Sequence, residues 1–471
     1  MENLMEKIVS LAKRRGFVFP SSEIYGGFSS CYDFGPLGVE MKNNIKRAWW
    51  DEMLKNHKDS EGISSASYGV NIVGLDAAIL MSPKVWQASG HLTAGFSDEL
   101  VECKSCHKRF RLDEIRRERP PSLAARSSVS SPAACPGCKG EMSRPRKFNL
   151  MMKTFVGPVE EEAAITYLRA ETCQGIYVNF KNVLQTMRLK IPFGIAQIGK
   201  AFRNEITPGN FIYRTREFEQ MEMQWFCRPK EADKFFNYWK RERLNWYINL
   251  GIKKNNLRAV EVSEKERAHY AKRQVDIEYK FPFGWQEIEG IHNRADWDLS
   301  NHSKYSGEDL KYFDEETKER YFPYIIETSG GADRSFLAFL CDAYQEIPGG
   351  RTKTTKPTKE VEVLLKLDKR IAPIKVAVLP LVKNKPELVK KAKEVYQLLK
   401  PNFVCQYDEL GSIGRRYRRG DEIGILYAIT VDFETLKNND VTVRRRDTMK
   451  QKRVKIKDLP RTLRRLFEKN C

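Results

Sequence analysis

Four of the ten cysteines stand in two CxxC pairs. Cys103 pairs with Cys106 and Cys135 with Cys138, and 28 residues separate the pairs. Thiolates at this spacing chelate one tetrahedral Zn²⁺ from two tight turns, which makes a closed structural site with no open position for catalysis. Four unrelated reduced cysteines are one alternative. A redox-active CxxC is another, and it is disfavoured because neither pair lies between a strand and the start of a helix.

A second set of reactive side chains falls on an expected β-hairpin. Strand-like runs at 196–206 and 213–226 are joined by Thr207–Asn210. Because alternate side chains of a strand share a face, Arg203 and Glu205 lie together. A second such face carries Arg214, Arg216, Phe218, Gln220 and Glu222. Arginines that neutralise phosphates, with an aromatic ring and a carboxylate for a purine, suit a bound nucleotide. A solvated, salt-bridged hairpin is the alternative.

A third pattern lies between Pro323 and Leu340. An apolar run leads into Gly330 and Gly331, and a second apolar run follows Arg334. We expect a buried strand, a Gly-Gly turn and a helix whose first turn presents Arg334 beside free backbone amides, which is an arrangement that binds phosphate. No GxxxxGK[ST] string is present, so this is no Walker A loop. A plain turn with a helix cap is the alternative.

The elements that must position these residues form two groups. In the N-terminal part, a helix is expected at about 39–53, and apolar strand-like and helical runs alternate over 149–346. From Ile371 onward, strand and helix patterns alternate at 376–381, 386–399, 402–406, 413–419 and 426–431. Alternation of this kind indicates a small α/β domain at the C-terminal end.

These strings, in this order, resemble the class II aminoacyl-tRNA synthetases. The segments 202–205 and 214–222 resemble their motif 2, and Gly331–Arg334 resembles motif 3. Further strings resemble the dimeric glycyl-tRNA synthetase family in particular: Ala88–His91, Leu168–Asn182, Gly284–Gly290 and Glu327–Ser329. The resemblance extends from about Ile8 to Arg465, which is nearly the whole chain.

The resemblance implies an α+β fold with a class II antiparallel-sheet catalytic domain. A zinc-ribbon-like insertion and a C-terminal α/β anticodon-binding domain complete it. The implied division is catalytic domain and dimer interface at 1–98, zinc-binding insertion at 99–148, catalytic core at 149–346, linker at 347–370 and anticodon-binding domain at 371–471. A homodimer is implied, through the region of Gly35–Met53 and the strand leading to Pro83.

The implied reaction has two steps and uses ATP with Mg²⁺. Glycine attacks the α-phosphate of ATP, and the glycyl group then passes to the terminal ribose of tRNA(Gly). The implied catalytic residues are Arg203 on the α-phosphate, Arg334 on the γ-phosphate and Glu205 on the adenine amino group, with Phe218 stacked on the base. The full implied ATP site is Arg203, Asn204, Glu205, Tyr213, Arg214, Thr215, Arg216, Glu217, Phe218, Glu287, Ile288, Gly331, Ala332, Asp333 and Arg334.

The implied amino-acid pocket must recognise a ligand without a side chain. Affinity therefore comes from charge, and alanine is rejected by its bulk. The resemblance places Glu171, Glu222, Glu327 and Ser329 around the ammonium, and Arg294 or Arg111 near the carboxylate. The remaining implied members are Phe218, Glu219, Gln220, Met221, Thr328, Gly330 and Gly331. Cys173 stands where the family usually has a small alanine.

The C-terminal domain carries much of the chain's positive charge. The run Arg415-Arg416-Tyr417-Arg418-Arg419 places an aromatic ring among cations, which suits an unpaired anticodon base. Residues 441–471 contain twelve basic and three acidic residues. A solvated protein surface is the alternative for either run, but two runs in one domain favour RNA.

The composition limits the class of protein. The 471 residues include 82 Lys+Arg and 62 Asp+Glu, a net charge of +20 that indicates a polyanionic partner. No run approaches the roughly 18 apolar residues of a membrane span. The N-terminus lacks a signal pattern and the six other cysteines are scattered, so we expect a cytoplasmic protein.

Two rival functions remain. A non-catalytic, nucleic-acid-binding paralogue would typically lose the nucleotide-binding residues, yet Arg203, Glu205 and Arg334 are all present. A synthetase for another small amino acid would need fewer converging carboxylates than this pocket supplies.

Overall fold

The computed structural model describes most of the chain. The described residues are 4–55, 72–92, 96–112, 115, 134–206, 209–268, 270–351 and 361–468. Three expected features lie partly outside them, namely the zinc-binding insertion 99–148, the start of the loop Thr207–Asn210 and the middle of the linker 347–370. No helix in the described ranges has the length and apolar character needed to cross a membrane.

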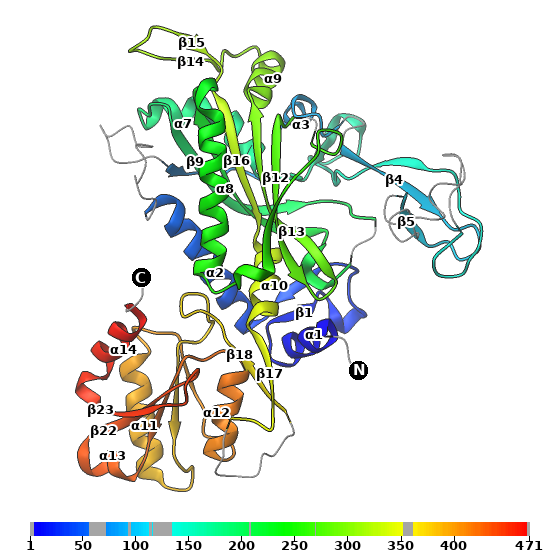
Figure 1. Ribbon diagram of the computed structural model, residues 1–471. Coiled ribbons are helices and arrows are strands. Elements are labelled where there is room, and N and C mark those ends of the chain that lie inside the picture. Colours follow the sequence, from blue (N-terminus) through cyan, green and yellow to red (C-terminus); the bar gives the residue numbers. More distant parts are fainter. Residues whose placement is uncertain are drawn as a thin grey trace.

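A seven-stranded sheet is the centre of the N-terminal part (Figure 1). All neighbouring strands are antiparallel except β3 and β9. In spatial order the strands are β11 (Leu257–Glu261), β12 (Arg273–Phe281), β13 (Gly284–Ala295), β16 (Tyr324–Gly331), β10 (Glu217–Cys227), β9 (Phe193–Phe202) and β3 (Ile72–Gly74). The expectation of a class II antiparallel sheet is thus confirmed.

Alternation along β10 separates the core of the protein from its site. Met221, Met223 and Trp225 are fully buried in the large core, which also takes in residues of three helices. These helices are α2 (Pro36–Leu54), α8 (Ala232–Asn249), which crosses the front of the sheet in Figure 1, and α10 (Ala332–Ala343). The even-numbered residues of β10 point to the opposite face. There Thr172 donates to Glu222 and Tyr177 donates to Gln224.

Shorter elements surround this sheet. The second face is covered by α6 (Cys173–Val178), α7 (Phe180–Thr186) and α9 (Trp297–Ser306), over a smaller apolar cluster around Phe180, Phe193 and Phe226. The remaining elements before the C-terminal domain are α1 (Leu4–Arg14), β1 (Val18–Pro20), β2 (Tyr32–Phe34), α3 (Pro83–Ala88), β14 (Tyr312–Phe313) and β15 (Arg320–Tyr321).

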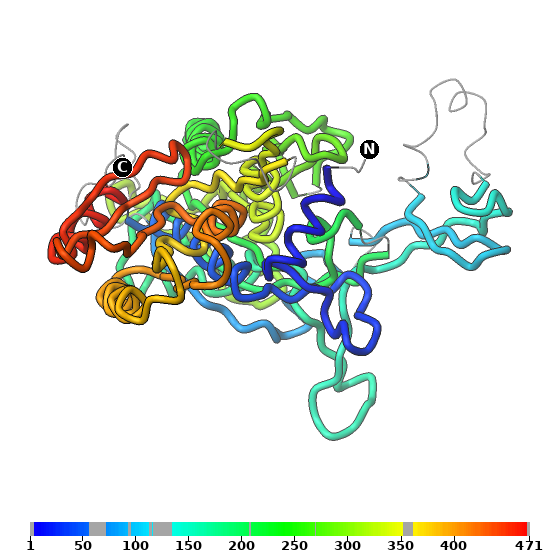
Figure 2. The backbone as a smooth tube through the Cα atoms, turned by 90° about the horizontal axis from the view of Figure 1, so that it is seen from below, coloured from blue at the N-terminus to red at the C-terminus, as the bar shows by residue number. Residues whose placement is uncertain are grey.

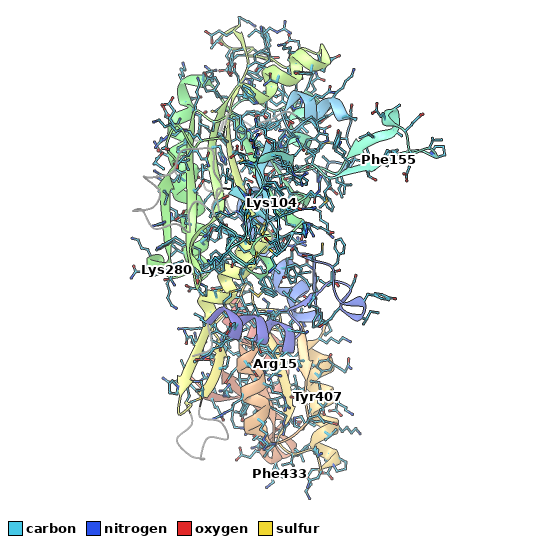
Figure 3. The ribbon with its side chains drawn as sticks, turned by 90° about the vertical axis from the view of Figure 1, so that its right-hand side faces the viewer. Arg15, Lys104, Phe155, Lys280, Tyr407 and Phe433 are labelled. Atoms are coloured by element: carbon cyan, nitrogen blue, oxygen red, sulfur yellow. The ribbon has the colours of Figure 1, made fainter. Side chains whose placement is uncertain are left out.

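The cysteine-bearing segment projects from the body of the molecule (Figure 2). It is built on a three-stranded sheet of β5 (Arg109–Arg111), β4 (Ser97–Glu102) and β6 (Arg146–Asn149). A separate hairpin of β7 (Lys153–Phe155) and β8 (Ile165–Tyr167) also projects, and Figure 3 shows Phe155 far out on it.

The C-terminal domain has the expected α/β character. A hairpin of β17 (Tyr344–Pro348) and β18 (Val361–Leu365) leads into it. Its sheet order is β20 (Cys405–Tyr407), β19 (Val376–Pro380), β21 (Tyr427–Val431), β22 (Asp440–Arg445) and β23 (Gln451–Lys455). Its helices are α11 (Pro386–Leu399), α12 (Ile413–Glu422), α13 (Phe433–Asn438) and α14 (Leu459–Glu468).

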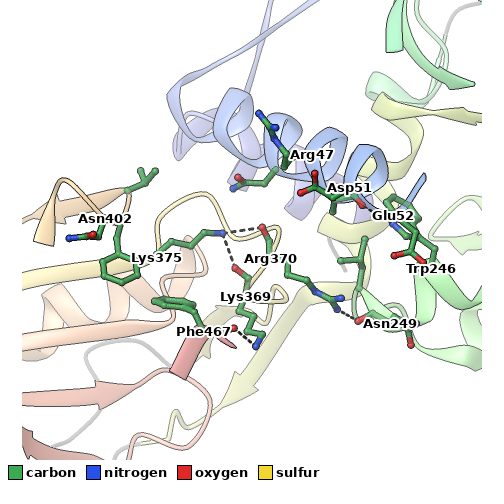
Figure 4. A pocket seen from close by; sticks show the side chains of 15 residues that line it. Arg47, Asp51, Glu52, Trp246, Asn249, Lys369, Arg370, Lys375, Asn402 and Phe467 are labelled. Atoms are coloured by element: carbon green, nitrogen blue, oxygen red, sulfur yellow. Dashed lines mark hydrogen bonds between the residues drawn. The ribbon is translucent and has the colours of Figure 1, made fainter. Parts of the chain in front are cut away.

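The two parts of the chain meet along α1, α2 and α8. Both Arg14 and Arg15 at the end of α1 pair with Glu422 of α12, and the Asn44 amide donates to the carbonyl of Ala372 at 3.0 Å. Beside these contacts lies a cavity of about 520 Å³ between α2, α8 and the C-terminal domain. In it Arg370 bonds to the Asn249 carbonyl and Lys375 to the loop before β19 (Figure 4).

Three sequence-based boundaries were wrong. The first strand of the motif 2 hairpin ends at Phe202 and the second begins at Glu217, because 211–213 form a single 3₁₀ turn; Arg203 and Glu205 therefore lie on a loop. The expected strand at 402–406 is confined to Cys405–Tyr407. Gly330 and Gly331 make no turn, since β16 runs straight into α10. A Cβ at Gly330 would lie 3.2 Å from Glu289, so close approach explains this glycine.

Candidate active site

One cavity of about 580 Å³ brings the predicted nucleotide and amino-acid residues together. It opens on the face of the sheet to which the even-numbered residues of β10 point. The predicted residues that line it are Arg111, Glu171, Arg203, Glu205, Tyr213, Arg214, Thr215, Phe218, Glu219, Gln220, Glu222, Glu287, Glu327, Ser329, Gly331, Asp333 and Arg334.

Other predicted residues do not line the cavity. Met221, Ile288 and Ala332 are fully buried in the core on the other side of the sheet. Strand alternation accounts for Met221, since its neighbours Gln220 and Glu222 are the ones that face the cavity. The remaining predicted residues outside the lining are Asn204, Arg216, Glu217, Arg294, Thr328 and Gly330.

The nucleotide end of the cavity has two arginines, each beside an aromatic ring. The Arg203 guanidinium lies 5.4 Å from the ring centre of Phe218, and its Nε donates to the Ala170 carbonyl at 3.1 Å. Arg334 lies 4.6 Å from the ring centre of Tyr213, with its Nη1 3.2 Å from Glu287 Oε2. An aromatic face and separated guanidinium groups match the base and phosphates of a nucleotide.

Glu205 supplies an unsatisfied acceptor at this end. Its Oε2 is buried and has no hydrogen-bond partner among the described residues, and Arg214 Nε is 3.8 Å away. A buried acceptor without a donor is costly, so a ligand that donates a hydrogen bond would be favoured here.

Three buried carboxylates form the other end. Glu171 accepts from the Gln174 amide at 2.9 Å and lies 3.4 Å from His91 Nε2. Glu327 lies 3.1 Å from Arg294 and 2.8 Å from His292.

Glu222 differs from the other two carboxylates because it has neutral partners only. It accepts from the Thr172 and Ser329 hydroxyls, both at 2.6 Å, and from the Gln220 amide at 3.0 Å. Within the described part of the chain, its hydrogen-bond partners are all uncharged.

The three carboxylates consequently have different pKa values. Burial together with the charges of Glu327 and Glu171 raises the pKa of Glu222 to about 7. Burial also opposes ionisation of Glu327, but Arg294 and His292 outweigh it and lower the pKa of Glu327 to about 2. At Glu171 the same opposition is overcome by His91 and Arg294, which hold its pKa well below the ordinary value. The pocket therefore lacks one positive charge, at Glu222.

The two arginines considered for the carboxylate of the amino acid have different surroundings. Arg294 is buried behind Glu327, bound to Asp298 at 2.7 and 2.8 Å and lying 3.6 Å from the ring centre of Tyr270. It is thus already paired and is turned away from the cavity. Arg111, on β5, lines the cavity and lies 3.1 Å from Asp98.

An acidic strip lies on two neighbouring strands at the mouth of the cavity. Glu278 of β12 is directly opposite Glu287 of β13, and Asp276 follows on the same face of β12. Burial and the charge of Glu287 raise the pKa of Asp276 to about 6. Glu287 is the member of this strip that lines the cavity, whereas Glu278 binds Arg258, and among the described residues these three carboxylates do not form a group close enough to hold one metal ion.

The four paired cysteines converge in the projecting segment. The sulfurs of Cys103 and Cys138 are 3.4 Å apart and those of Cys106 and Cys135 are 3.7 Å apart, and all four lie within 4.8 Å of one another. Zn–S bonds of about 2.3 Å in a tetrahedron place sulfurs roughly 3.8 Å apart. The backbone amide of Cys106 helps to lower the pKa of Cys103 to about 6. The cluster fits a tetrahedral metal.

The sequence missed three residues of the amino-acid end. These are Tyr270, Gln274 and His292, all of which line the cavity. His292 was detectable, because it stands two residues before Arg294 and strand alternation puts both on one face of β13. No motif or periodic pattern marks Tyr270, which lies just before β12, or Gln274, which is the second residue of that strand.

The expected RNA-facing run is only partly exposed. Arg416 is buried and donates to the carbonyls of Pro380, Leu381 and Asp408. Tyr417 bonds to Thr430 at 2.5 Å. Arg416 is therefore not exposed to RNA, contrary to the expectation, whereas Tyr417 is half-buried.

The other members of that run differ in their exposure. Arg419 pairs with Asp408 at 2.6 Å, whereas Arg415 is exposed. The basic residues after 441 that are exposed are Arg445, Lys450, Lys452, Lys455, Lys457, Arg461, Arg464 and Arg465.

Comparison with known proteins agrees with this geometry. The family model described as the tRNA synthetase class II core domain (G, H, P, S and T) matches residues 158–344, and the anticodon binding domain model matches 375–466. A glycine–tRNA ligase of Thermobifida fusca is 51 % identical, with 96 % of each chain covered. One from Streptomyces coelicolor is 50 % identical, also over 96 % of each chain. One from Treponema denticola is 51 % identical over 96 % of this chain and 94 % of its own. The chain therefore belongs to the glycine–tRNA ligase family of class II aminoacyl-tRNA synthetases.

Proposed function

We propose that this chain activates glycine with ATP and transfers the glycyl group to the 3′-terminal adenosine of tRNA(Gly). The observation that carries the proposal is the unbalanced charge at Glu222, next to a cavity end equipped for a nucleotide. An ammonium group supplies the missing positive charge, and glycine is the amino acid that brings an ammonium with the least bulk.

In the first step a carboxylate oxygen of glycine attacks the α-phosphorus of ATP. The bond to the β-phosphate oxygen breaks, and pyrophosphate leaves with the electron pair. Arg203, beside Phe218, holds the α-phosphate, and Arg334, beside Tyr213, holds the γ-phosphate. Phe218 stacks on adenine, and the free oxygen of Glu205 accepts from its amino group. Preorganised cations of this kind lower the barrier because negative charge develops on the transferring phosphoryl group.

In the second step a terminal ribose hydroxyl of the tRNA attacks the carbonyl carbon of glycyl-adenylate. An ester bond forms, and AMP leaves with the electron pair of the broken anhydride bond. The protein residues that bind the nucleotide stay in contact with the same α-phosphate in both steps. One cavity therefore serves both steps.

The selectivity for glycine rests on the carboxylate end. Glu222 binds the ammonium, and Ser329 and Thr172 fix the orientation of its two oxygens. Of Arg111 and Arg294, Arg111 is the one that lines the cavity and can pair with the carboxylate of glycine. A side-chain methyl group would have to fit among the three carboxylates, so alanine is excluded by overlap.

Mg²⁺ would be held chiefly by the phosphates of ATP, with Glu287 as the carboxylate of the acidic strip that lines the cavity. When bound, it would neutralise phosphate charge on ATP and on the leaving pyrophosphate. Zn²⁺ fits the cluster of Cys103, Cys106, Cys135 and Cys138, whose four thiolates leave no open position, so its role is structural.

The anticodon-binding domain supplies the RNA contacts. Arg415 on α12 and the exposed cations after 441 are the side chains available to tRNA phosphates and bases. The proposed division of the chain is catalytic domain and dimer interface at 1–98, zinc-binding insertion at 99–148, catalytic core at 149–346, linker at 347–370 and anticodon-binding domain at 371–471. A homodimer through Gly35–Met53 and the strand leading to Pro83 rests on the family resemblance, as does a cytoplasmic location.

The proposed activity is tested by amino-acid-dependent ATP–pyrophosphate exchange without tRNA. We expect exchange with glycine and none with alanine, serine or proline. In Glu222→Ala the glycine-dependent rate should fall about 100-fold, because a buried charge-assisted contact is lost, while tRNA binding is retained.

Glu315→Ala is the matched control, since Glu315 is an exposed glutamate between β14 and β15. Its exchange rate should equal that of the parent. Absence of exchange with every amino acid would favour the non-catalytic paralogue, and exchange with a different amino acid would refute the pocket assignment. An unchanged rate in Glu222→Ala would refute it as well.

The dependence on pH follows from the carboxyl group of Glu222. Its raised pKa of about 7 means that it is protonated, and cannot pair with an ammonium, at lower pH. We expect KM for glycine to rise about tenfold from pH 8 to pH 6. In Glu222→Gln the activity should be low and KM for glycine nearly independent of pH. The same slope in both proteins would assign the titration to another group.

The metal at the cysteine cluster is tested by its stoichiometry. Protein expressed with ample zinc should contain about one Zn²⁺ per chain by mass spectrometry of the metal. Cys106→Ser should lose this metal and unfold at a lower temperature, while Cys405→Ser, outside the cluster, should keep it. A metal-free parent with the same unfolding temperature as Cys106→Ser would contradict a structural zinc site.

A further inference from the structure

The strand that carries the adenine-stacking residue extends past the strand that supports it. β16 pairs with β10 from Cys227 only as far as Gln220. The first residues of β10, including Phe218 and Glu219, pair with β9 on one side alone. Their other edge needs a different support, because an unpaired backbone donor in a buried place is costly.

Asp333 supplies that support from the first turn of α10. Its Oδ2 accepts the backbone N–H of Glu219 at 2.8 Å, and the side chain is almost completely buried. Asp333 immediately precedes Arg334, the proposed γ-phosphate ligand. A single side-chain contact thus connects the N-terminal end of β10 to the start of α10.

Lys42 joins both carboxylates from a third element, α2. Its Nζ lies 2.6 Å from Asp333 Oδ1 and 2.8 Å from Glu219 Oε2. It also lies 4.1 Å above the ring centre of Phe34, and only 8 % of the residue is exposed. Burial alone would lower the pKa of Lys42, but Asp333 and Glu219 outweigh it and raise the pKa, so the amine is held as a cation.

A neighbouring lysine provides a natural comparison. Lys46, one turn further along α2, lies 3.0 Å from Glu219 Oε1, whereas the lysine that pairs with Asp333 is Lys42. Its side chain is also more exposed, at 24 % against 10 % for Lys42. Lys46 therefore pairs with β10 alone, whereas Lys42 connects β10 with α10.

We propose that Lys42 is a positioning residue for ATP: from α2 it fixes the spacing between Phe218 on β10 and Arg334 on α10. This inference rests on the proposed function, in which Phe218 stacks on the base and Arg334 binds the γ-phosphate at the other end of the same molecule. The buried triad of Lys42, Glu219 and Asp333 determines how far apart those two groups lie. A displacement of the order of 1 Å in such a pair is enough to weaken a two-ended ligand markedly.

The glycine end does not depend on the triad in the same way. Glu222 lies where β10 and β16 are fully paired, directly opposite Ser329, and backbone hydrogen bonds of the sheet hold both. Removal of Lys42 should therefore disturb the ATP end and leave the glycine end in place. A general loss of folding would instead reduce the concentration of active enzyme and leave both KM values unchanged.

The test compares three variants by steady-state pyrophosphate exchange with the full chain. In Lys42→Met we expect KM for ATP to rise about tenfold or more, with KM for glycine within about twofold of the parent. Lys42→Arg, which retains the charge and can contact both carboxylates, should recover most of the ATP affinity. Lys46→Met should keep KM for ATP within about twofold.

Thermal unfolding checks that each variant is folded, and Lys42→Gln, neutral and similar in length, replaces Lys42→Met if that protein does not fold. An unchanged KM for ATP in a folded neutral variant would overturn the inference, as would equal increases in both KM values. Equal effects of Lys42→Met and Lys46→Met would overturn it too. If the parent itself shows no glycine-dependent exchange, the proposed function fails, and that outcome is distinct from a normal parent with unaffected variants.

Discussion

The charge balance of one buried pocket organises the catalytic part of this protein. Glu171 and Glu327 each have a cationic or imidazole partner, whereas Glu222 has only hydroxyl and amide donors. Two carboxylates with low pKa next to one with a raised pKa make a site that is one positive charge short. An ammonium ligand supplies this charge. The three buried acids therefore make the pocket selective for a small amino acid.

The fold serves this pocket through strand alternation and one buried ion triad. Met221, Met223 and Trp225 of β10 pack into the core under α2, α8 and α10, which fixes the strand, and Phe218, Gln220 and Glu222 are thereby directed into the cavity. The paired length of β10 and β16 holds the glycine end. Beyond this paired length, the contacts among Lys42, Glu219 and Asp333, and not sheet hydrogen bonds, hold the nucleotide end. Affinity for the two substrates thus depends on separate structural supports.

The alternating side chains of β10 and the two nucleotide-site arginines were the most predictable part of the site. Phe218, Gln220 and Glu222 share a face, as period-two alternation requires, and they line the cavity with Arg203 and Arg334. Residue type alone did not reveal which cations are already paired. Arg294 and Arg416 are buried and bound to Asp298 and to backbone carbonyls, whereas Arg111 pairs with Asp98 and still lines the cavity. Likewise, Lys42 belongs to no motif, because its partners are more than 170 residues away in the sequence.

The central claim is that glycine supplies the charge missing at Glu222, and the protons exchanged on binding test it most directly. Titration calorimetry of glycine at pH 7, in buffers of different ionisation enthalpy, measures this number. With a pKa of about 7 in the empty pocket, Glu222 should release about half a proton per glycine bound, and Glu222→Gln should release none. Glycine binding without proton release in the parent, or equal release in both proteins, would contradict the account.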